Sequence, residues 1–465
     1  MMNLANRAGR AAAACAVAAG SMLLGACNVK QELLAPQNPG VIDPGAVANT
    51  AAADALWVGT LGRWKASMNG GGNNTEALWN WQALFTDELQ SGDTFSQRND
   101  ADSRNLQTND GVLTPIYQAA QQTRGRARDA INGLLAYDQT ALGKQHVGEM
   151  YLVMGYTEME LGESFCNGIP LGETVAGAPV YTQPLTNADV FKQALARLDT
   201  ALTFLTATDA ATVTIKQAVL TTRGRIKVDL GDFAGAAAEV PASAVPTNFQ
   251  YNWDYTQTTF DNEWWIMGAS VKRYTLGDSV SIAGQIANAI PFVHLNDPRV
   301  KVVNSGAPGE DNVTTFIDQG NWGRDDPIPP LSGIDARLIE AEADLQANDI
   351  AGMMTILNTL RTTQQTLGIF KPATLPALAT PADKTTATDL FFREKALWQF
   401  ERGYRMGDLR RLVRQYGRTQ DKVFPSGAFV RNGTPTGTYG TQVAFPVPDH
   451  EMNNPNFHGC LDTKA

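Results

Sequence analysis

Apolar residues recur at steps of three and four along most of this chain, with polar residues between them. That spacing places the apolar side chains on one face of an α-helix. It predicts helices over residues 51–68, 76–84, 115–135, 147–163, 187–205, 332–346 and 350–363, and a helix–turn–helix over 217–240. The polar stretch over 87–110 predicts a loop with little regular structure. The fold is therefore expected to be mainly α-helical.

Two of the predicted helix corners share a sequence pattern. Residues 230–236 read LGDFAGA and residues 347–353 read ANDIAGM, so each has an apolar residue followed by Ala-Gly. Both resemble the corners of tetratricopeptide (TPR) helix hairpins, where small residues let two helices pack closely. The copies are about 117 residues apart, so they do not form a tandem array. Ordinary helix hairpins are the alternative interpretation.

Residues 241–330 differ from the rest of the chain. They are rich in Gly, Pro, Asn and aromatic residues, and they show little helical periodicity. This composition predicts a large loop-rich insert that packs on a scaffold of helical hairpins.

A charged amphipathic stretch, LFFREKALWQFERGYRMGDLRR, covers residues 390–411. Leu390, Leu397, Phe400 and Tyr404 share one helical face, and Gly403 is a natural break. Glu401 and Arg405 have the spacing and order of a helical ion pair. Because no His, Cys or Ser nucleophile lies nearby, we expect a structural ion-pair network and not a catalytic site. Its members would be Arg393, Glu394, Glu401, Arg405, Asp408, Arg410 and Arg411.

The N-terminus has the features of a lipoprotein signal peptide over residues 1–26. Arg7 and Arg10 precede a short apolar segment over 11–24, which is too short to span a membrane. It ends in LLGAC, the bacterial lipobox, which implies cleavage before Cys27 and lipidation of that residue. Residues 27–50 would then form a lipidated tether, so the mature protein would be anchored and not spanning. A chance Cys after an ordinary signal peptide is the alternative.

Charge and cysteine content limit the partners and the environment. The chain carries a formal net charge of −10 and has no long basic stripe, so nucleic acid is not an expected partner. Once Cys15 is removed and Cys27 is lipidated, Cys166 and Cys460 remain. In an oxidising envelope such an isolated pair is a disulfide candidate, with two unpaired thiols as the alternative.

The familiar catalytic and cofactor motifs do not occur in the sequence. There is no HExxH, CxxC or phosphate-binding glycine loop, and no GxSxG motif. The 47 acidic residues always permit a carboxylate pair in space, but nothing singles one out for glycoside hydrolysis. We therefore predict no catalytic residue, no metal site and no cofactor.

Aromatic residues suggest binding instead. Sugars present apolar C–H faces that fit indole rings, while Asn, Asp and Arg can satisfy the hydroxyl groups. Packing in the core is the alternative for each tryptophan. The candidates for such a platform are Trp79, Trp81, Trp253, Trp264, Trp265 and Trp322.

Several segments, in the same order, resemble the SusD/RagB family of surface lipoproteins, which capture nutrients for a TonB-dependent outer-membrane transporter. Residues 149–171 resemble the family's first TPR helix and its glycine–proline turn, and residues 335–361 resemble its later helix pair. The C-terminal signature is matched by Arg393-Glu394, Phe400-Glu401, Arg405 and residues 408–411, and the closing motif by residues 445–448, Glu451 and residues 454–456. The match spans the mature chain, but the insert resembles nothing in the family pattern.

This resemblance implies a SusD-like domain over 51–465, with the loop-rich insert at about 241–330 on the ligand side. It implies a lipid-anchored protein of the outer membrane that faces the exterior and works without a covalent step. The ligand would be an oligosaccharide or a peptide, delivered to a SusC-like TonB-dependent transporter. The family would build the binding surface from the loops before the first TPR and from the insert.

Two other functions are compatible with the sequence. A TPR-type lipoprotein could scaffold envelope assembly without binding any nutrient. A surface glycan hydrolase is the third class, and it would need a catalytic carboxylate that the sequence does not single out.

Overall fold

The structure is mainly helical, as the apolar spacing predicts. This computed structural model describes residues 47–71, 76–175, 178–257, 260–277, 286–287, 289–431 and 434–465. The predicted signal peptide, Cys27 and most of the tether lie outside the described residues. The helices are α2 (Thr50–Asn69), α3 (Leu78–Phe85), α4 (Ser96–Asp102), α5 (Leu113–Tyr137), α6 (Ala141–Ser164), α7 (Asn187–Phe204), α8 (Ala210–Asp229), α9 (Phe233–Glu239), α10 (Glu263–Trp265), α11 (Gly333–Gln346), α12 (Ile350–Thr362), α13 (Lys384–Trp398) and α14 (Arg405–Arg414).

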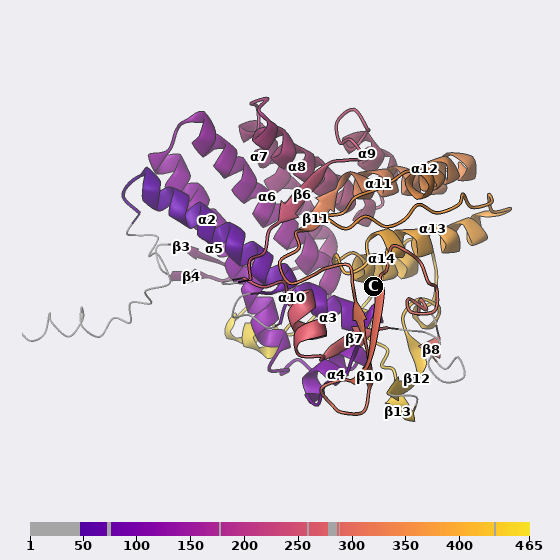
Figure 1. The fold of residues 1–465 in the computed structure, drawn as a ribbon. Coiled ribbons are helices and arrows are strands. Elements are labelled where there is room, and N and C mark those ends of the chain that lie inside the picture. Colours follow the sequence, from indigo (N-terminus) through magenta and orange to yellow (C-terminus); the bar gives the residue numbers. More distant parts are fainter. Residues whose placement is uncertain are drawn as a thin grey trace, which may run out of the picture. The chain divides into compact units, whose positions relative to one another are not determined.

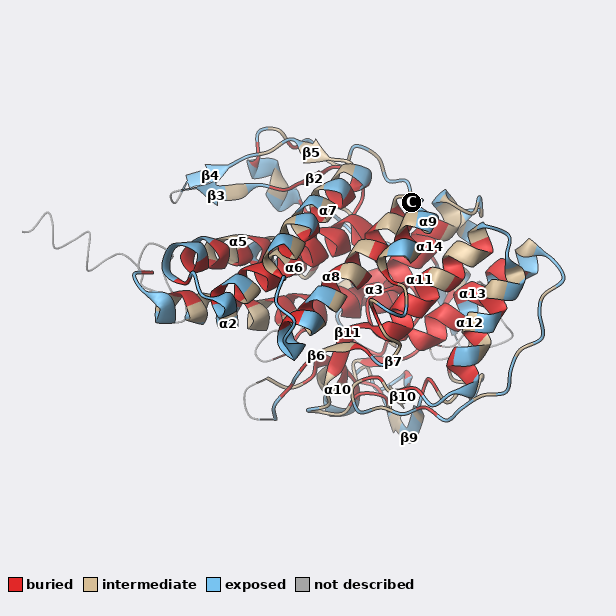
Figure 2. Ribbon diagram, turned by 90° about the horizontal axis from the view of Figure 1, so that it is seen from above, coloured by how far each residue is buried: buried red, intermediate tan, exposed pale blue. Residues whose placement is uncertain are grey.

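Most of these helices stand side by side in chain order. Figure 1 shows the row from α2 and α5 through α6, α7 and α8 to α9, α11 and α12. The second half of the long helix α6 lies in the core, because every residue from Leu152 to Ser164 is buried (Figure 2). Three glycines at seven-residue spacing let α7 approach it closely. A Cβ at Gly148, Gly155 or Gly162 would lie within 2.8 Å of a side chain of α7 or of its C-cap.

The two repeated corners are the turns of the hairpins α8–α9 and α11–α12, and they share a geometry. Gly231 and Asn348 have positive φ angles, which end the first helix. Asp232 and Asp349 then cap the second helix, accepting hydrogen bonds from the amides of Gly235 and Gly352 at 2.9 and 2.8 Å. The shared sequence therefore specifies a helix stop followed directly by a helix start.

The described residues between α9 and α11 form short strands and turns, with the short helix α10 and a π-helical turn. Here β6 (Gln250–Trp253) pairs antiparallel with β11 (Ile328–Ser332), and β9 (Val302–Pro308) with β10 (Thr315–Gln319). Also present are a π-helical turn η2 (Ile266–Ser270), β7 (Tyr274–Leu276) and β8 (Ile286–Ala287). Outside this part lie β1 (Leu89–Ser91), β2 (Ile169–Pro170), β3 (Glu173–Val175), β4 (Ala178–Val180), β5 (Pro184–Leu185), β12 (Ser426–Arg431), β13 (Thr434–Thr438) and the 3₁₀ turns η4 (Gln420–Lys422) and η5 (Asp449–Asn453). Among the described helices, none is both long and apolar enough to cross a membrane.

The stretch over 390–411 differs from its prediction at one point. The helix α13 ends at Trp398 and α14 begins at Arg405, with a turn between them in which Glu401 and Gly403 have φ angles of 57° and 73°. Because Glu401 and Arg405 do not share a helix, the predicted ion pair between them does not form. Glu401 is fully buried, and no described group donates a hydrogen bond to its carboxyl oxygens.

Other members of the predicted network do form buried ion pairs. Glu394 lies between Arg299 and Arg361, with contacts of 2.6 Å from Arg299 Nη1 to Oε2 and 2.8 Å from Arg361 Nη1 to Oε1. Arg393, directly before it, is exposed and lies outside the network. Asp408 accepts from Lys395 Nζ at 2.7 Å and from Arg411, and these two cations also bind Glu342. The buried carboxylate of Glu342 on α11 thus binds α13 through Lys395 and α14 through Arg411.

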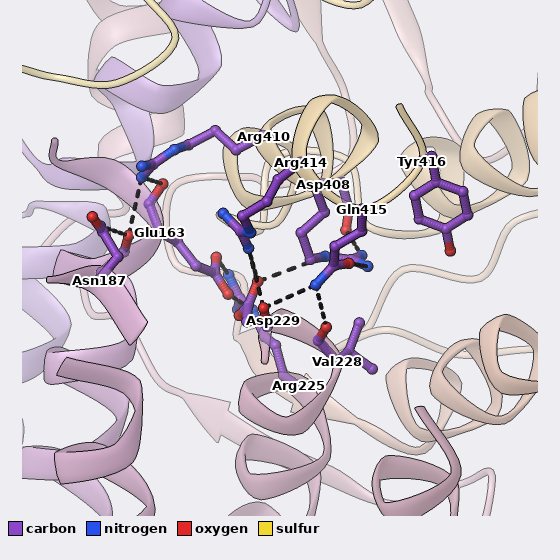
Figure 3. A network of polar contacts seen from close by, with 12 residues as sticks. Glu163, Asn187, Arg225, Val228, Asp229, Asp408, Arg410, Arg414, Gln415 and Tyr416 are labelled. Carbon is purple, nitrogen blue, oxygen red and sulfur yellow. Dashed lines mark hydrogen bonds and ion pairs between the residues drawn. The ribbon is translucent and has the colours of Figure 1, made fainter. Parts of the chain in front are cut away.

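A second cluster ties α14 to α6, α7 and α8 (Figure 3). Arg410 donates through Nη1 to the carbonyls of Gly162, Glu163 and Phe165 at 2.8–3.0 Å, which satisfies the otherwise open C-terminal end of α6. Arg225 on α8 binds both carboxyl oxygens of Glu163. Arg410 of the C-terminal signature therefore stabilises the helical core.

The C-terminal tail is fastened to the first half of the chain. Cys166 and Cys460 form a disulfide with their Cα atoms 6.0 Å apart. Beside it, the amide of Cys166 donates to the carbonyl of Phe445 at 2.9 Å. The tail and the end of α6 thus hold each other in place.

We predict that Glu394→Gln lowers the free energy of unfolding by about 3–5 kcal/mol, because it leaves the buried Arg361 guanidinium without its ion-pair partner and Arg299 with Asp297 alone. Arg393→Gln is the matched control and should change it by no more than about 0.5 kcal/mol. Urea denaturation at pH 7 measures both values. Equal effects of the two substitutions would show that the Glu394 pairs do not stabilise the fold.

Candidate functional site

The best-supported candidate site lies where the segment before α5 meets the insert. The strand β1 pairs antiparallel with β7, with Ser91 opposite Tyr274. The contact continues beyond the strands, because the amide of Gly92 donates to the carbonyl of Arg273 at 2.8 Å. In Figure 1, α4, β7, β10, β12 and β13 gather below the helix row. The region 87–110, predicted as an irregular loop, therefore contains a strand and a helix.

A buried carboxylate organises this meeting point. Asp93 binds Arg98 from α4 and accepts from Arg273 Nη1 at 2.8 Å and from the amide of Phe95 at 3.1 Å. Burial alone would raise the pKa of Asp93, but the hydrogen bond from Arg273 and the charge of Arg98 outweigh it and lower the pKa. Asp93 therefore stays ionised and holds the buried guanidinium group of Arg98 and the partly exposed one of Arg273.

A second carboxylate, Glu76, binds the same cluster. It accepts from Arg98 Nε at 2.6 Å, from the Tyr274 hydroxyl at 2.8 Å and from the Trp81 indole at 3.0 Å. Arg98 is thus bound by two carboxylates, which raise its pKa despite the opposing effect of burial. Its orientation is fixed without any ligand.

An exposed aromatic ring lies next to the two arginines. Phe95 is 50% exposed, and its ring centroid is 4.8 Å from Cζ of Arg98 and 5.1 Å from Cζ of Arg273. Arg273 also lines an open hollow of about 490 Å³, together with Lys272, Glu310, Asn312 and neighbouring backbone. We call this arrangement of ring, arginines and hollow the Phe95 site.

The hollow is bordered by unusual backbone. It includes Ser270, the last residue of the π-helical turn η2, and Lys272 and Asn312 both have positive φ angles. π-Helical turns are rare and frequently occur at functional sites. Directly before this turn, Trp265 is partly exposed, and the Arg324 guanidinium lies 4.8 Å from its ring centroid.

The structure places the other five candidate tryptophans in the interior. Trp79 lies 4.9 Å from Trp253 between ring centroids, and Trp81 is bound to Glu76. These rings fill the core because large aromatic side chains contribute most by burial. The five buried residues are Trp79, Trp81, Trp253, Trp264 and Trp322, so only Trp265 among the six retains an exposed surface for a ligand.

Sequence reasoning missed the residues of the Phe95 site. Asp93, Phe95 and Arg98 fall in the stretch predicted as a loop, and their partner Arg273 lies 180 positions from Asp93. One indication was available, because Phe95 is the one aromatic residue in the polar stretch over 87–110.

Two buried carboxyl groups and one half-buried one, that of Asp318, lie close to these strands. Glu88 directly precedes β1, Asp318 lies in β10, and Glu401 lies in the turn before α14. Burial raises the pKa of Glu88 to about 7 against the charge of Arg405, and that of Asp318 to about 7. Burial and the charges of Glu88 and Asp318 raise the pKa of Glu401 well above its usual value. The cluster therefore holds protons near neutral pH.

The Phe95 site is suited to binding. Its ring offers an apolar face, its guanidinium and ammonium groups donate hydrogen bonds, and Glu310 and Asn312 offer acceptors. Within the described residues, no group of His, Cys, Asp and Glu is arranged to hold a metal ion.

Comparison with known proteins identifies the architecture. No family model and no curated protein matches the sequence. A SusD-like carbohydrate-binding protein from Bacteroides fragilis matches at 12% identity with a TM-score of 0.62, over 88% of this chain and 99% of that chain. A SusD superfamily protein from Bacteroides thetaiotaomicron matches at 13% identity with a TM-score of 0.61, over 89% and 100%. The chain has the SusD fold.

A third solved structure supports the same assignment. A SusD-like carbohydrate-binding protein from Bacteroides vulgatus matches at 13% identity with a TM-score of 0.61, over 88% of this chain and 98% of that chain. The predicted mainly α SusD-like fold is therefore confirmed. Within the SusD fold of this chain, the Phe95 site is formed by the segment before α5 and by the insert.

We predict that Glu401→Gln changes how stability depends on pH. A carboxyl group whose folded-state pKa is raised binds more protons in the folded than in the unfolded state, so folding loses stability as pH rises above about 4.5. The Glu401→Gln variant has no ionisable group at this position, so it does not lose stability in this way as pH rises. Its free energy of unfolding should gain on the wild type by up to about 1.4 kcal/mol per pH unit between pH 5 and 8.

Urea denaturation across this pH range measures the difference between the two proteins. Glu310→Gln, at an exposed carboxylate, serves as the control and should give a nearly constant difference. A pH-independent difference for Glu401→Gln would mean that Glu401 is not a buried protonated group.

Proposed function

We propose that this protein binds an oligosaccharide at the Phe95 site and delivers it to a TonB-dependent outer-membrane transporter. The single observation that carries the proposal is the half-exposed Phe95 ring on a SusD fold. It lies next to the guanidinium groups of Arg98 and Arg273, and Arg273 lines an open hollow. Solved proteins of this fold are named as carbohydrate-binding.

The chemistry of the Phe95 site supports a sugar ligand. The exposed ring can cover the apolar C–H face of a pyranose, and the neighbouring side chains can bind its hydroxyl groups. Because Asp93 and Glu76 already fix the arginines, little side-chain freedom is lost on binding. Trp265, directly before the π-helical turn that borders the hollow, offers a second partly exposed ring.

Localisation and partner are further parts of the proposal. The lipobox that ends at Cys27 supports an outer-membrane lipoprotein that faces the exterior. In this proposal the protein acts as a lid over the transporter, and the helix row is its docking face. The process is binding and closure, without a covalent step.

We predict that Phe95→Ala weakens binding of the cognate glycan at least about tenfold, equal to about 1.4 kcal/mol. Trp265→Ala should weaken it in the same direction. The matched control is Tyr137→Ala, which removes a 44% exposed ring at the far end of α5. A glycan screen followed by titration calorimetry on the full chain gives the affinities. Equal binding by Phe95→Ala and the control would remove the Phe95 site from the proposal, and selective binding of peptides would change the ligand class.

We also predict that the native lipoprotein, purified from detergent-solubilised outer membranes, brings a TonB-dependent barrel with it in near-equal amount. Cys27→Ser cannot be lipidated and should leave the membrane fraction. Mass spectrometry of the co-purified proteins and fractionation of the variant test the two parts. Recovery of envelope-assembly proteins without a barrel would favour a scaffold, and membrane retention of the variant would contradict the lipid anchor.

A further inference from the structure

The β12–β13 hairpin lies beside the Phe95 site without lining its hollow. The two strands pair antiparallel, and every residue of β13 is exposed. Phe429 and Tyr439 form a small apolar cluster there, with their ring centroids 5.2 Å apart. Figure 1 shows the hairpin near β10, below the helix row. Within the described ranges, no residue that lines the hollow comes from β12 or β13, so the hairpin can affect the hollow only through other segments.

Arg431, the last residue of β12, is bonded to both parts of the Phe95 site. Its Nη2 donates to the Asp93 carbonyl at 2.9 Å, in the segment before α5 that carries Phe95. The same nitrogen donates to Asp311 Oδ2 at 2.7 Å, in the insert loop between β9 and β10. The side chain of Arg431 is 21% exposed and that of Asp311 is 10% exposed. Because water has little access to this charge-assisted bond, it can hold the two segments together.

Asp311 also shapes the loop that borders the hollow. Its Oδ1 accepts from the amides of Val313 and Thr314 at 2.9 and 2.8 Å, and its Oδ2 accepts from the Thr314 hydroxyl at 2.6 Å. Asn312, directly after it, lines the hollow and has a φ angle of 57°, in the left-handed region. The path of the loop, and with it the placement of Glu310 and Asn312 in the hollow, therefore depends on Asp311.

Backbone hydrogen bonds join the same loop to the strands of the site. The amide of Asp311 donates to the Gly92 carbonyl at 3.0 Å, and the amide of Glu310 donates to the Lys272 carbonyl at 3.0 Å. The contacts thus form a closed circuit from Asp311 through Arg431 to residues 92–93 and back. Because the Arg431 contact with Asp311 is made by side chains, a substitution can remove it while the backbone contacts stay.

We propose that Arg431 is a positioning residue of the Phe95 site, which holds the 309–314 loop against the segment that carries Phe95 so that one oligosaccharide contacts both the ring and the hollow. A fixed spacing benefits a ligand that reaches both parts, since preorganisation lowers the entropic cost of binding. A short ligand that occupies one part gains little from it. This inference rests on the proposed function and adds that the site selects for the length of the glycan.

Hydrogen exchange of the unliganded full chain in detergent tests the positioning. Arg431→Gln should speed amide exchange over residues 309–314 at least about tenfold, while residues 152–164 of α6 keep their rate. Asp311→Asn should act in the same way, because its Oδ1 still accepts from the two loop amides but an NH₂ group replaces the acceptor for Arg431. The control is Arg418→Gln, which removes an arginine with a 2.7 Å ion pair to the exposed Asp389.

Binding of long and short glycans tests the consequence. The probes for titration calorimetry are maltohexaose, cellohexaose, xylohexaose and mannohexaose, each with its trisaccharide. For the hexaose that the wild type binds most tightly, Arg431→Gln should lower the affinity about tenfold, and for its trisaccharide less than about twofold. If Arg431 only stabilised the fold, both affinities of the folded protein would stay unchanged. Arg431→Lys should retain part of the affinity, because both bonds come from one terminal nitrogen and an ammonium group has three donors.

The outcomes separate this inference from the proposed function. Hexaose binding by the wild type together with unchanged exchange over 309–314 in Arg431→Gln and Asp311→Asn would overturn the positioning role alone. Equal weakening of hexaose and trisaccharide binding would overturn the selection for length. Binding of no hexaose by the wild type would overturn the proposed function, and faster exchange in the two variants would then assign Arg431 to the stability of the loop only.

Discussion

The structure depends on burying a helix that carries charge. The second half of α6 has no exposed residue, yet it contains Glu158, Glu160 and Glu163. A carboxylate can be buried at acceptable cost only if a cation and hydrogen bonds accompany it. Arg124 on α5 binds Glu158 at 2.9 Å, and Arg225 on α8 binds both Glu160 and Glu163. The helices beside α6 must therefore supply cations at particular positions as well as fit its surface.

The same constraint reaches the end of the chain. The helix α6 ends inside the protein, so its last carbonyls need donors that water cannot supply. Arg410 provides them from α14, and the disulfide of Cys166 fixes the tail beside it. Residues more than 240 positions apart thus meet at one helix end. From this fixed point the turn before α14 reaches the end of the insert, where Arg402 Nε donates to the Pro329 carbonyl at 2.8 Å. Arg402 also binds Asp335 at the start of α11 with a contact of 2.6 Å. The site is therefore mounted on a rigid frame.

Local patterns in the sequence predicted the features that neighbouring residues determine. The row of helices follows from apolar spacing, and the two matching corners follow from Asp232 and Asp349 as caps after left-handed residues. The Phe95 site could not be found in this way, because β1 has three residues and is specified by pairing with β7, far along the chain. Glu401 shows the same limit. Its spacing to Arg405 indicates a helical pair, but Gly403 and the contacts of the turn with the insert end the helix between them.

The aromatic residues illustrate why counting a residue type does not locate a site. Tryptophan has the largest surface to bury, so in a large core its default position is inside, where Trp79 and Trp253 lie. Phe95 is the opposite case, because leaving half of a phenylalanine ring in water forgoes part of the free energy of burial. The flanking guanidinium groups of Arg98 and Arg273 offset part of that loss, and they are held in place by Asp93 at a cost in desolvation. The fold gains little from such an arrangement by itself. In the proposed function, a ligand that covers the ring would recover the rest of that free energy of burial.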